Sequence, residues 1–114
     1  MKQFIIALSI VGLINGNRVN PVVANERLNR VADCRAEFLH SLDIWSHLGW
    51  TWCFRINGVY GGIGEVLSKD FDKNEHVVNA WMNSPSHKNV ITNESYTKVG
   101  TSQLYNYVIA VFQR

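Results

Sequence analysis

The stretch VVNAWMNSPSHKNV, residues 77–90, decides how the second half of the chain folds. Its first part carries apolar side chains at the spacing of one helix face, namely Val77, Val78, Trp81 and Met82. Pro85 disfavours helix at the residue before it and suits the first position of a new helix, with Ser84 as the cap. The pattern predicts two short helices joined by a tight corner, and it places His87 in the first turn of the second helix.

Two further helix starts can be read upstream of this stretch. Asp72 and Glu75 have the spacing of a capping box, which predicts that the first of the two short helices begins near Lys73. A longer helix is predicted over residues 26–40, because Asn25 is a good N-cap and a broad, mostly apolar face follows it. That face comprises Leu28, Val31, Ala32, Cys34, Arg35, Phe38 and Leu39.

Three segments have the composition of strands: residues 63–67, 96–102 and 105–112. A turn is expected near Ser102 and Gln103. The last segment has little polar face, so it is expected to be covered on both sides. Helices followed by antiparallel strands predict an α+β domain, with helices packed on a small, mainly antiparallel sheet.

Composition and charge restrict the possible functions. A chain of 114 residues suits one domain, and 46% hydrophobic residues are enough for a core. The net charge is +2 and the basic residues are scattered, which argues against a nucleic-acid partner. Glycines between residues 58 and 64 suggest close backbone approach beside Glu65, but no phosphate-binding motif accompanies them, so nucleotide binding is rejected.

The two cysteines leave the redox state open. Cys34 and Cys53 form one disulfide if the protein is exported, whereas Cys34 is a small buried hydrophobic residue if it lies on the core face of its helix. The chain contains no C-x-x-C, so neither a redox motif nor a thiolate zinc site is expected.

The N-terminal segment has the composition of a secretory signal. Lys2 precedes an apolar stretch over residues 4–14, which is too short to span a bilayer as an ordinary helix. We therefore expect residues 1–16 to be a signal peptide. The protein is then secreted or held in the cell envelope, without a stable membrane span.

Several blocks together resemble the bacterial branch of the CAP superfamily, the cysteine-rich secretory, antigen 5 and pathogenesis-related-1 type or SCP domain. They are NERLNRVADCRAEFL at residues 25–39, WSH at 45–47, IGEVLSKDF at 63–71 and WMNSPSHKNVI at 81–91. The resemblance assigns residues 17–114 to the domain and implies an α-β-α sandwich. Many members open with a helix that ends in an IN..R pattern, which residues 14–18 match, so residues 1–16 are alternatively the first helix of the domain.

The resemblance also implies a central cleft that gathers histidines and acidic residues. The family's first histidine and its GE glutamate correspond to His47 and Glu65, and the bacterial branch takes a second histidine from the SPSH turn, here His87. Two departures from the family stand out. The late histidine of the eukaryotic branch is missing from residues 105–111, and the usual GEN reads GEV, which puts an inherited activity in doubt.

Two imidazoles and a carboxylate suit two kinds of chemistry. They can bind Zn²⁺ or another divalent metal with one position left for water, or Glu65 can orient a histidine that acts as a general base. His47, Glu65 and His87 are therefore predicted as catalytic residues or as metal ligands, and a structural polar network is the third interpretation. Residues 43–52 are expected to form an irregular, aromatic connection beside this site. The residues expected to line the cleft are Trp45, Trp50 and Ser86.

Three functions remain open from the sequence. The first is a secreted or envelope CAP-domain protein whose His/Glu cleft binds a ligand or divalent metal without established catalysis. The second is a metal-assisted or histidine-dependent hydrolase of peptide or cell-envelope substrates. The third is a lipid-binding or protein-interaction module that uses the aromatic residues 45–54. The expected partner is an extracellular ligand, a lipid or a cell-envelope component, and the protein is expected to be a monomer.

Overall fold

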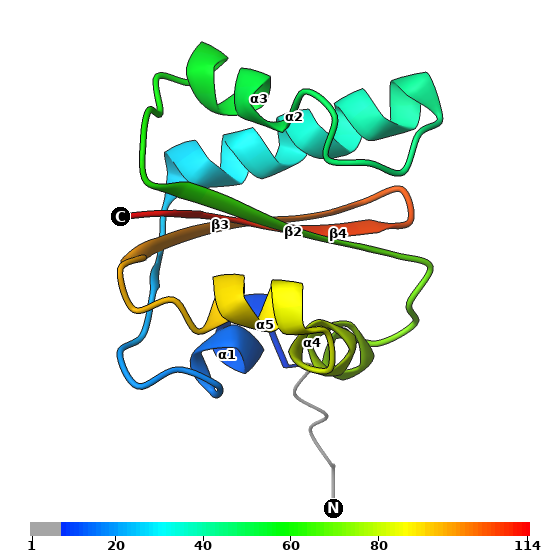
Figure 1. The fold of residues 1–114 in the computed structure, drawn as a ribbon. Coiled ribbons are helices and arrows are strands. Elements are labelled where there is room, and N and C mark those ends of the chain that lie inside the picture. Colours follow the sequence, from blue (N-terminus) through cyan, green and yellow to red (C-terminus); the bar gives the residue numbers. More distant parts are fainter. Residues whose placement is uncertain (1–7) are drawn as a thin grey trace, which may run out of the picture.

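The computed structural model describes residues 8–114, which form one sheet between two layers of helices (Figure 1). One face of the sheet is covered by α2 (Glu26–Leu42) and α3 (Trp50–Ile56). The other face is covered by three shorter helices, which are α1 (Ile10–Asn15), α4 (Asn74–Met82) and α5 (Pro85–Ile91). The predicted α+β sandwich is confirmed.

The sheet has four strands in the order β1-β3-β4-β2. They are β1 (Val23–Ala24), β2 (Ile63–Lys69), β3 (Lys98–Leu104) and β4 (Tyr107–Gln113). The short β1 runs parallel to β3, and the other neighbours are antiparallel. The central β4 is buried on both faces, as its sequence predicts, whereas β2 lies at an edge of the sheet.

The helix α2 lies directly against the sheet. Its N-cap is Asn25, as predicted, whose side-chain oxygen accepts a hydrogen bond from the N–H of Leu28 at 3.0 Å. Beneath it, Gly100 of β3 leaves no room for a side chain, because a Cβ there would overlap the Leu28 carbonyl group. The absence of a side chain at one strand position thus allows the helix backbone to rest on the strand.

A disulfide joins Cys34 of α2 to Cys53 of α3, with the two Cα atoms 5.7 Å apart. The choice between a disulfide and a buried free thiol is therefore decided in favour of the disulfide. Both cysteines lie on the same side of the sheet, so this bond ties the two helices of one layer to each other.

Three local predictions were wrong. The helix α4 begins at Asn74 with Lys73 as its N-cap, which confirms the predicted start, but the predicted capping box does not form, because the Asp72 carboxylate accepts a hydrogen bond from His76 at 2.8 Å instead of capping the backbone. Residues 43–52 were expected to form an irregular connection, but residues 50–56 form the helix α3, because the aromatic sequence interrupted by Gly49 has no clear helical pattern. The β3–β4 turn lies at Tyr105 and Asn106, where the left-handed Tyr105 is held by stacking on His40.

The N-terminal helix α1 is part of the fold. Its Ile10 and Ile14 are buried and belong to the apolar cluster that also contains residues of α4 and α5. Residues 1–7 lie outside the described part of the chain, so the expectation of a signal peptide stays a prediction. No helix in residues 8–114 has the length and hydropathy needed to cross a membrane.

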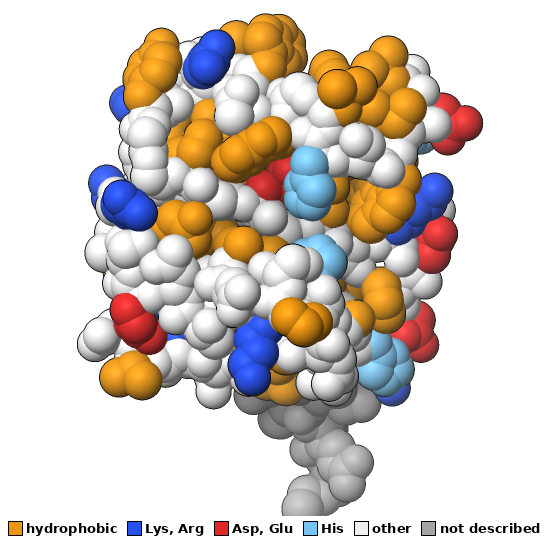
Figure 2. Space-filling model, viewed as in Figure 1, with side chains coloured by type: hydrophobic (Ala, Val, Ile, Leu, Met, Phe, Trp, Pro, Cys, Tyr) orange, Lys and Arg blue, Asp and Glu red, His pale blue; other side chains and the backbone are white. Residues whose placement is uncertain are grey.

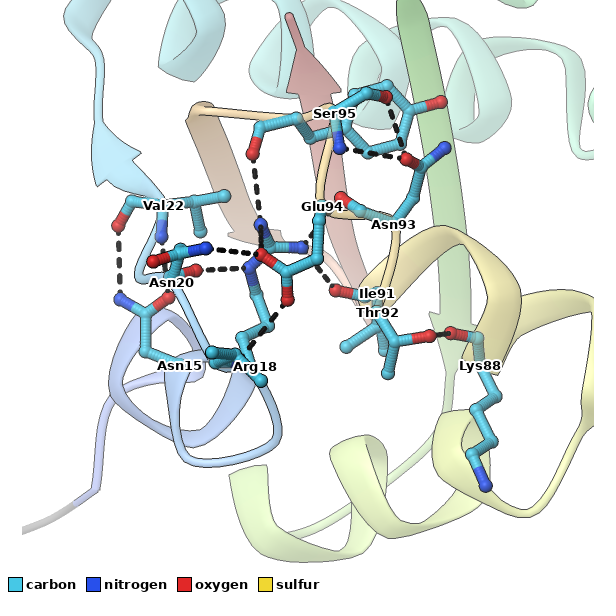
Figure 3. A network of polar contacts seen from close by, with 12 residues as sticks. Asn15, Arg18, Asn20, Val22, Lys88, Ile91, Thr92, Asn93, Glu94 and Ser95 are labelled. Carbon is cyan, nitrogen blue, oxygen red and sulfur yellow. Dashed lines mark hydrogen bonds and ion pairs between the residues drawn. The ribbon is translucent and has the colours of Figure 1, made fainter.

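The turn after α1 is fixed by Arg18 (Figure 3), whose side chain is fully buried. Its guanidinium donates to four carbonyl oxygens, those of Asn20, Ile91, Asn93 and Tyr96, at 2.7–2.9 Å. The carboxylate of Glu94 lies 3.7 Å away and is 43% exposed. Arg18 therefore ties the N-terminal turn to the loop between α5 and β3 mainly through backbone carbonyls.

Candidate functional site

The site is built around a buried ion pair between the helix α2 and the edge strand β2. Arg35 of α2 is fully buried, and its Nε donates to Glu65 Oε1 of β2 at 2.5 Å. Its Nη2 donates to the other carboxylate oxygen at 3.3 Å, and the guanidinium also reaches the carbonyl oxygens of Ser46 and Leu48 at 3.2 Å. Because the guanidinium matches the planar carboxylate, the charge of Glu65 is compensated and its orientation is fixed.

His47 lies on top of this pair, in the loop that Arg35 holds. Its Nδ1 is 2.8 Å from Glu65 Oε2, and its side chain is 56% exposed while that of Glu65 is 1% exposed. A carboxylate only accepts hydrogen bonds, so Nδ1 carries the proton. The second ring nitrogen, Nε2, makes no hydrogen bond within residues 8–114. The arrangement therefore presents one imidazole nitrogen to solvent in a fixed direction.

His87, in the first turn of α5 as predicted, is held differently. Its Nδ1 lies 2.9 Å from Ser84 Oγ, so the predicted capping residue binds a side chain rather than the helix backbone. Burial lowers the pKa of His87 below its usual value, and the charge on nearby His47 lowers the pKa further. The two rings therefore interact electrostatically. His87 makes no hydrogen bond to Glu65 or to His47 in the described structure.

Two neighbouring clefts open beside these histidines. One, of about 290 Å³, is lined by His47, Trp50, Ile63, Gly64, Glu65, Val90 and Tyr96. The other, of about 280 Å³, is lined by Trp45, Leu67, Ser68, Lys69, Phe71, Ala80, Trp81, Ser84 and His87. The predicted cleft residues Trp45 and Trp50 are therefore found in different clefts, and Ser86 lines neither. Figure 2 shows histidine and acidic side chains across the middle of this face, between hydrophobic groups.

The glycine beside Glu65 permits a close contact at the floor of the first cleft. A Cβ on Gly64 would lie 2.9 Å from the Tyr96 ring, which packs over the strand at this point. The Tyr96 hydroxyl donates to the carbonyl oxygen of Ile63 at 3.2 Å. This is the close backbone approach that the glycine-rich segment suggests.

The residues fit a bound divalent metal only in part. Both oxygens of Glu65 already bind Arg35 or His47, so this carboxylate is placed to orient a histidine rather than to act as a ligand. The remaining donors are the Nε2 atoms of His47 and His87. No group of three potential ligands among His, Cys, Asp and Glu occurs in residues 8–114. Zinc binding stays a prediction, and no chemical step here depends on it.

Sequence reasoning missed the role of Arg35. The residue falls on the apolar face of the predicted helix, between Val31 and Leu39, and an arginine there needs a buried partner. The only sequence signal was this misplaced charge. Its partner, Glu65, lies 30 residues away, and no local pattern connects the two.

The sequence and the fold were compared with known proteins. A family model described as the cysteine-rich secretory protein family, CAP, matches residues 13–107. A comparison with curated proteins gives no match.

Similar solved structures come from several bacteria. An SCP-domain extracellular protein of Bacillus anthracis has a TM-score of 0.84 at 18% identity over 92% of this chain and 39% of its own. A cysteine-rich secretory protein of Staphylococcus aureus has a TM-score of 0.78 at 18% identity, over 90% of this chain and 37% of its own. An outer surface protein of Borrelia burgdorferi has a TM-score of 0.74 at 25% identity, over 92% of this chain and 86% of its own.

The chain thus spans under two fifths of the Bacillus and Staphylococcus proteins and most of the Borrelia protein. Since the family model covers most of the sequence and the fold agrees, this chain belongs to the cysteine-rich secretory protein (CAP) family.

Proposed function

We infer that this protein is an extracellular CAP domain that binds a ligand at the cleft of His47 and Glu65 without catalysing its conversion. The observation that carries this inference is the fixed, exposed imidazole of His47, which rests on a buried carboxylate. A surface histidine that serves only solubility needs no buried carboxylate and arginine beneath it. The Arg35–Glu65 pair is costly to bury, and here it orients a single ring nitrogen at the mouth of a cleft.

The surface of the chain offers a matched control for this idea. His76 is 53% exposed and its Nδ1 lies 2.8 Å from Asp72, much like His47 above Glu65. The difference is the support, because the side chain of Asp72 is 76% exposed whereas that of Glu65 is buried and paired. A ligand that needs an oriented imidazole in a cleft should therefore depend on His47 and not on His76.

The location outside the cytoplasm is supported by two observations. The solved structures that resemble this chain include an extracellular and an outer surface protein. The Cys34–Cys53 disulfide is of the kind that persists in oxidising compartments.

The test uses three defined probes: a muropeptide, a short blocked peptide and a medium-chain fatty acid. NMR signals of the His47 ring and the Trp50 indole are followed in wild-type protein, His47→Ala and His76→Ala. We expect at least one probe to shift both signals in wild type and in His76→Ala and to bind His47→Ala far more weakly, with the probe recovered unchanged. Equal binding by all three proteins, or no response at the cleft, would refute the proposal.

A hydrolase is the second candidate, and a specific observation favours it. A carboxylate that holds Nδ1 and leaves Nε2 free is the arrangement of a histidine general base. No serine or cysteine in residues 8–114 bonds to that nitrogen, so the attacking group would be water. Turnover of peptide or muropeptide probes by wild type, lost in His47→Ala and kept in His76→Ala, would replace the binding proposal with this one.

The lipid-binding alternative rests on a separate, apolar groove. Trp52 is 53% exposed and packs near Phe38, beside a hollow of about 380 Å³ that also contains Leu42 and Ile56. The fatty-acid probe tests it directly. Shifts at Trp52 that persist in His47→Ala would assign the apolar ligand to this groove.

A further inference from the structure

The strand β2 has a free edge. Within residues 8–114 it pairs only with β4, and the residues just outside its ends, Gly62 and Asp70, bond to the backbone of Arg114 and Asn106 on the β4 side. Main-chain groups of an antiparallel strand point alternately to its two sides. Residues 64, 66 and 68 therefore bond to β4, and residues 63, 65, 67 and 69 direct their N–H and C=O groups to the free edge.

Two of these outward carbonyl groups are already satisfied by side chains. The Tyr96 hydroxyl donates to the Ile63 oxygen at 3.2 Å, and the Trp81 indole donates to the Leu67 oxygen at 2.9 Å. Between them, the N–H and C=O of Glu65 have no partner within residues 8–114. Glu65 as a whole is 7% exposed while its side chain is 1% exposed, so the part that faces solvent is mainly backbone.

The two clefts lie along this edge, one at each end of the strand. The first is lined by Ile63, Gly64 and Glu65, and the second by Leu67, Ser68 and Lys69. Figure 1 shows β2 at the sheet edge between the two helical layers. We refer to these two clefts together as the groove, and the unpaired N–H and C=O of Glu65 lie on the strand between the two occupied carbonyl groups of Ile63 and Leu67.

The charges of this groove are one-sided. Its ionisable side chains are those of His47, Lys69, His87 and Glu65. Glu65 is neutralised by Arg35, so the full charge that remains among the lining residues is the positive charge of Lys69, and the two imidazoles add polar nitrogen atoms beside it. The walls are aromatic, with Trp50 in the first cleft and Trp45 in the second.

We propose that the groove binds an extended peptide segment of a partner protein as an added strand on β2. The peptide backbone pairs with the N–H and C=O of Glu65, an acidic side chain faces Lys69 and His87, and apolar side chains enter the tryptophan-lined hollows. Added strands gain affinity from the backbone and specificity from such alternating pockets. This inference rests on the proposed function, because it names the class of ligand for the same cleft.

The depth of the groove favours a single extended chain over a second copy of this domain. The edge of β2 is recessed, since Gly64 to Ser68 are all buried. A lone peptide can enter between the helical layers, whereas the edge strand of another folded sheet would bring its own neighbouring helices into contact with them.

The test begins with a random heptapeptide library displayed on phage and selected on the full chain. Enriched peptides are synthesised with blocked ends and titrated into labelled protein. We expect acidic and apolar residues to alternate in them, and bound peptide to slow exchange of the Glu65 amide by at least about tenfold. N-methylation of the peptide residue that pairs with Glu65 should weaken binding about tenfold, because it removes one backbone donor.

A charge reversal completes the test. Lys69 and Lys98 are both exposed, but Lys98 begins β3, away from the free edge of β2. Lys69→Glu should weaken an acidic peptide about tenfold and Lys98→Glu should not change its affinity. The proposal is overturned if no peptide is enriched, if the N-methylated peptide binds equally well, or if the free protein dimerises through β2 in sedimentation and exchange experiments. Small probes that still shift the His47 ring would show that only the peptide inference failed.

Discussion

The two helical layers each contain an arginine whose side chain is fully buried, and the two side chains are stabilised in opposite ways. Arg35, in the layer of α2 and α3, pairs with the buried carboxylate of Glu65. Arg18, in the layer of α1, α4 and α5, donates mainly to backbone carbonyls, and its carboxylate neighbour Glu94 is half exposed and 3.7 Å away. One arginine forms part of a site and the other fixes a loop.

The comparison shows what a buried charge is used for. Backbone carbonyl groups around the Arg18 side chain accept its hydrogen bonds, so no second ionised group has to be buried beside it. Beside His47, a second charge is buried as well, and it holds an exposed imidazole.

Breaking the Arg35–Glu65 pair should have the largest effect. Arg35→Met leaves the Glu65 carboxylate buried with only the His47 ring as a partner, and we expect the free energy of unfolding to fall by about 3–5 kcal/mol. Urea denaturation measures this. The double variant with Glu65→Leu should recover most of the loss, because no charge then remains buried. A loss below about 1 kcal/mol in the single variant would show that solvent reaches the pair.

Removing the disulfide tests how far the Arg35 layer depends on a covalent link. Cys34 and Cys53 are 19 residues apart, so Cys34→Ala with Cys53→Ala should lower the free energy of unfolding by about 3 kcal/mol through unfolded-state entropy. Thermal unfolding with and without reductant should give the same difference. Wild-type protein that is unaffected by complete reduction would contradict the prediction.

Arg18→Met should destabilise the opposite layer by about 1–3 kcal/mol, because several carbonyl groups lose a charged donor. Hydrogen exchange should localise the loss. We expect faster exchange in the turn after α1 and in the loop of residues 91–96, with little change in α2. A uniform increase in exchange would mean that the two layers unfold together.

Replacing the acidic neighbour of each arginine sharpens the contrast. Glu94→Gln should change the free energy of unfolding by no more than about 0.5 kcal/mol, because the pair is long and half exposed. Glu65→Gln removes the negative charge that compensates a buried guanidinium and should cost several times more. Equal losses of unfolding free energy in the two variants would show that Arg18 and Arg35 depend equally on their acidic neighbours.

The smallest expected effect is on the titration of His87. Its pKa is lowered by burial and then by His47, so NMR should place it below 6.5 in wild type, and His47→Ala should raise it part of the way back. A lowered pKa in the folded state means that the unfolded state binds the proton more tightly. The contribution of His87 to stability is therefore lost as the pH falls below about 6.5. An unchanged pKa in His47→Ala would show that the two rings do not interact.

The sequence predicts the fold better than the site. The α2 helix, with its Asn25 cap, and the start of α5 at Pro85 were predictable because local spacing and cap chemistry determine them. The turn at Tyr105 was not, because its left-handed backbone is held by a ring stacked from a distant helix.

The site also depends on contacts between residues that are far apart in the sequence. His47 and Glu65 were expected together only through the family resemblance, and the structure brings them within hydrogen-bonding distance. The position of His87 in its own cleft depends on the packing of α5 against β2, and the role of Arg35 depends on a contact across 30 residues. Long-range packing decides both, and no single segment of the sequence encodes it.

The contacts of Arg18 have a consequence for the order in which the chain folds. Its partners Ile91, Asn93 and Tyr96 are 73, 75 and 78 residues further along the chain. During synthesis the N-terminal turn is made early but remains without these partners until most of the sequence has been made. Contacts of such large separation close long loops and form late. The segment around Arg18 should therefore be the last part to join the domain, so that the fold is completed by residues that were made well before their partners.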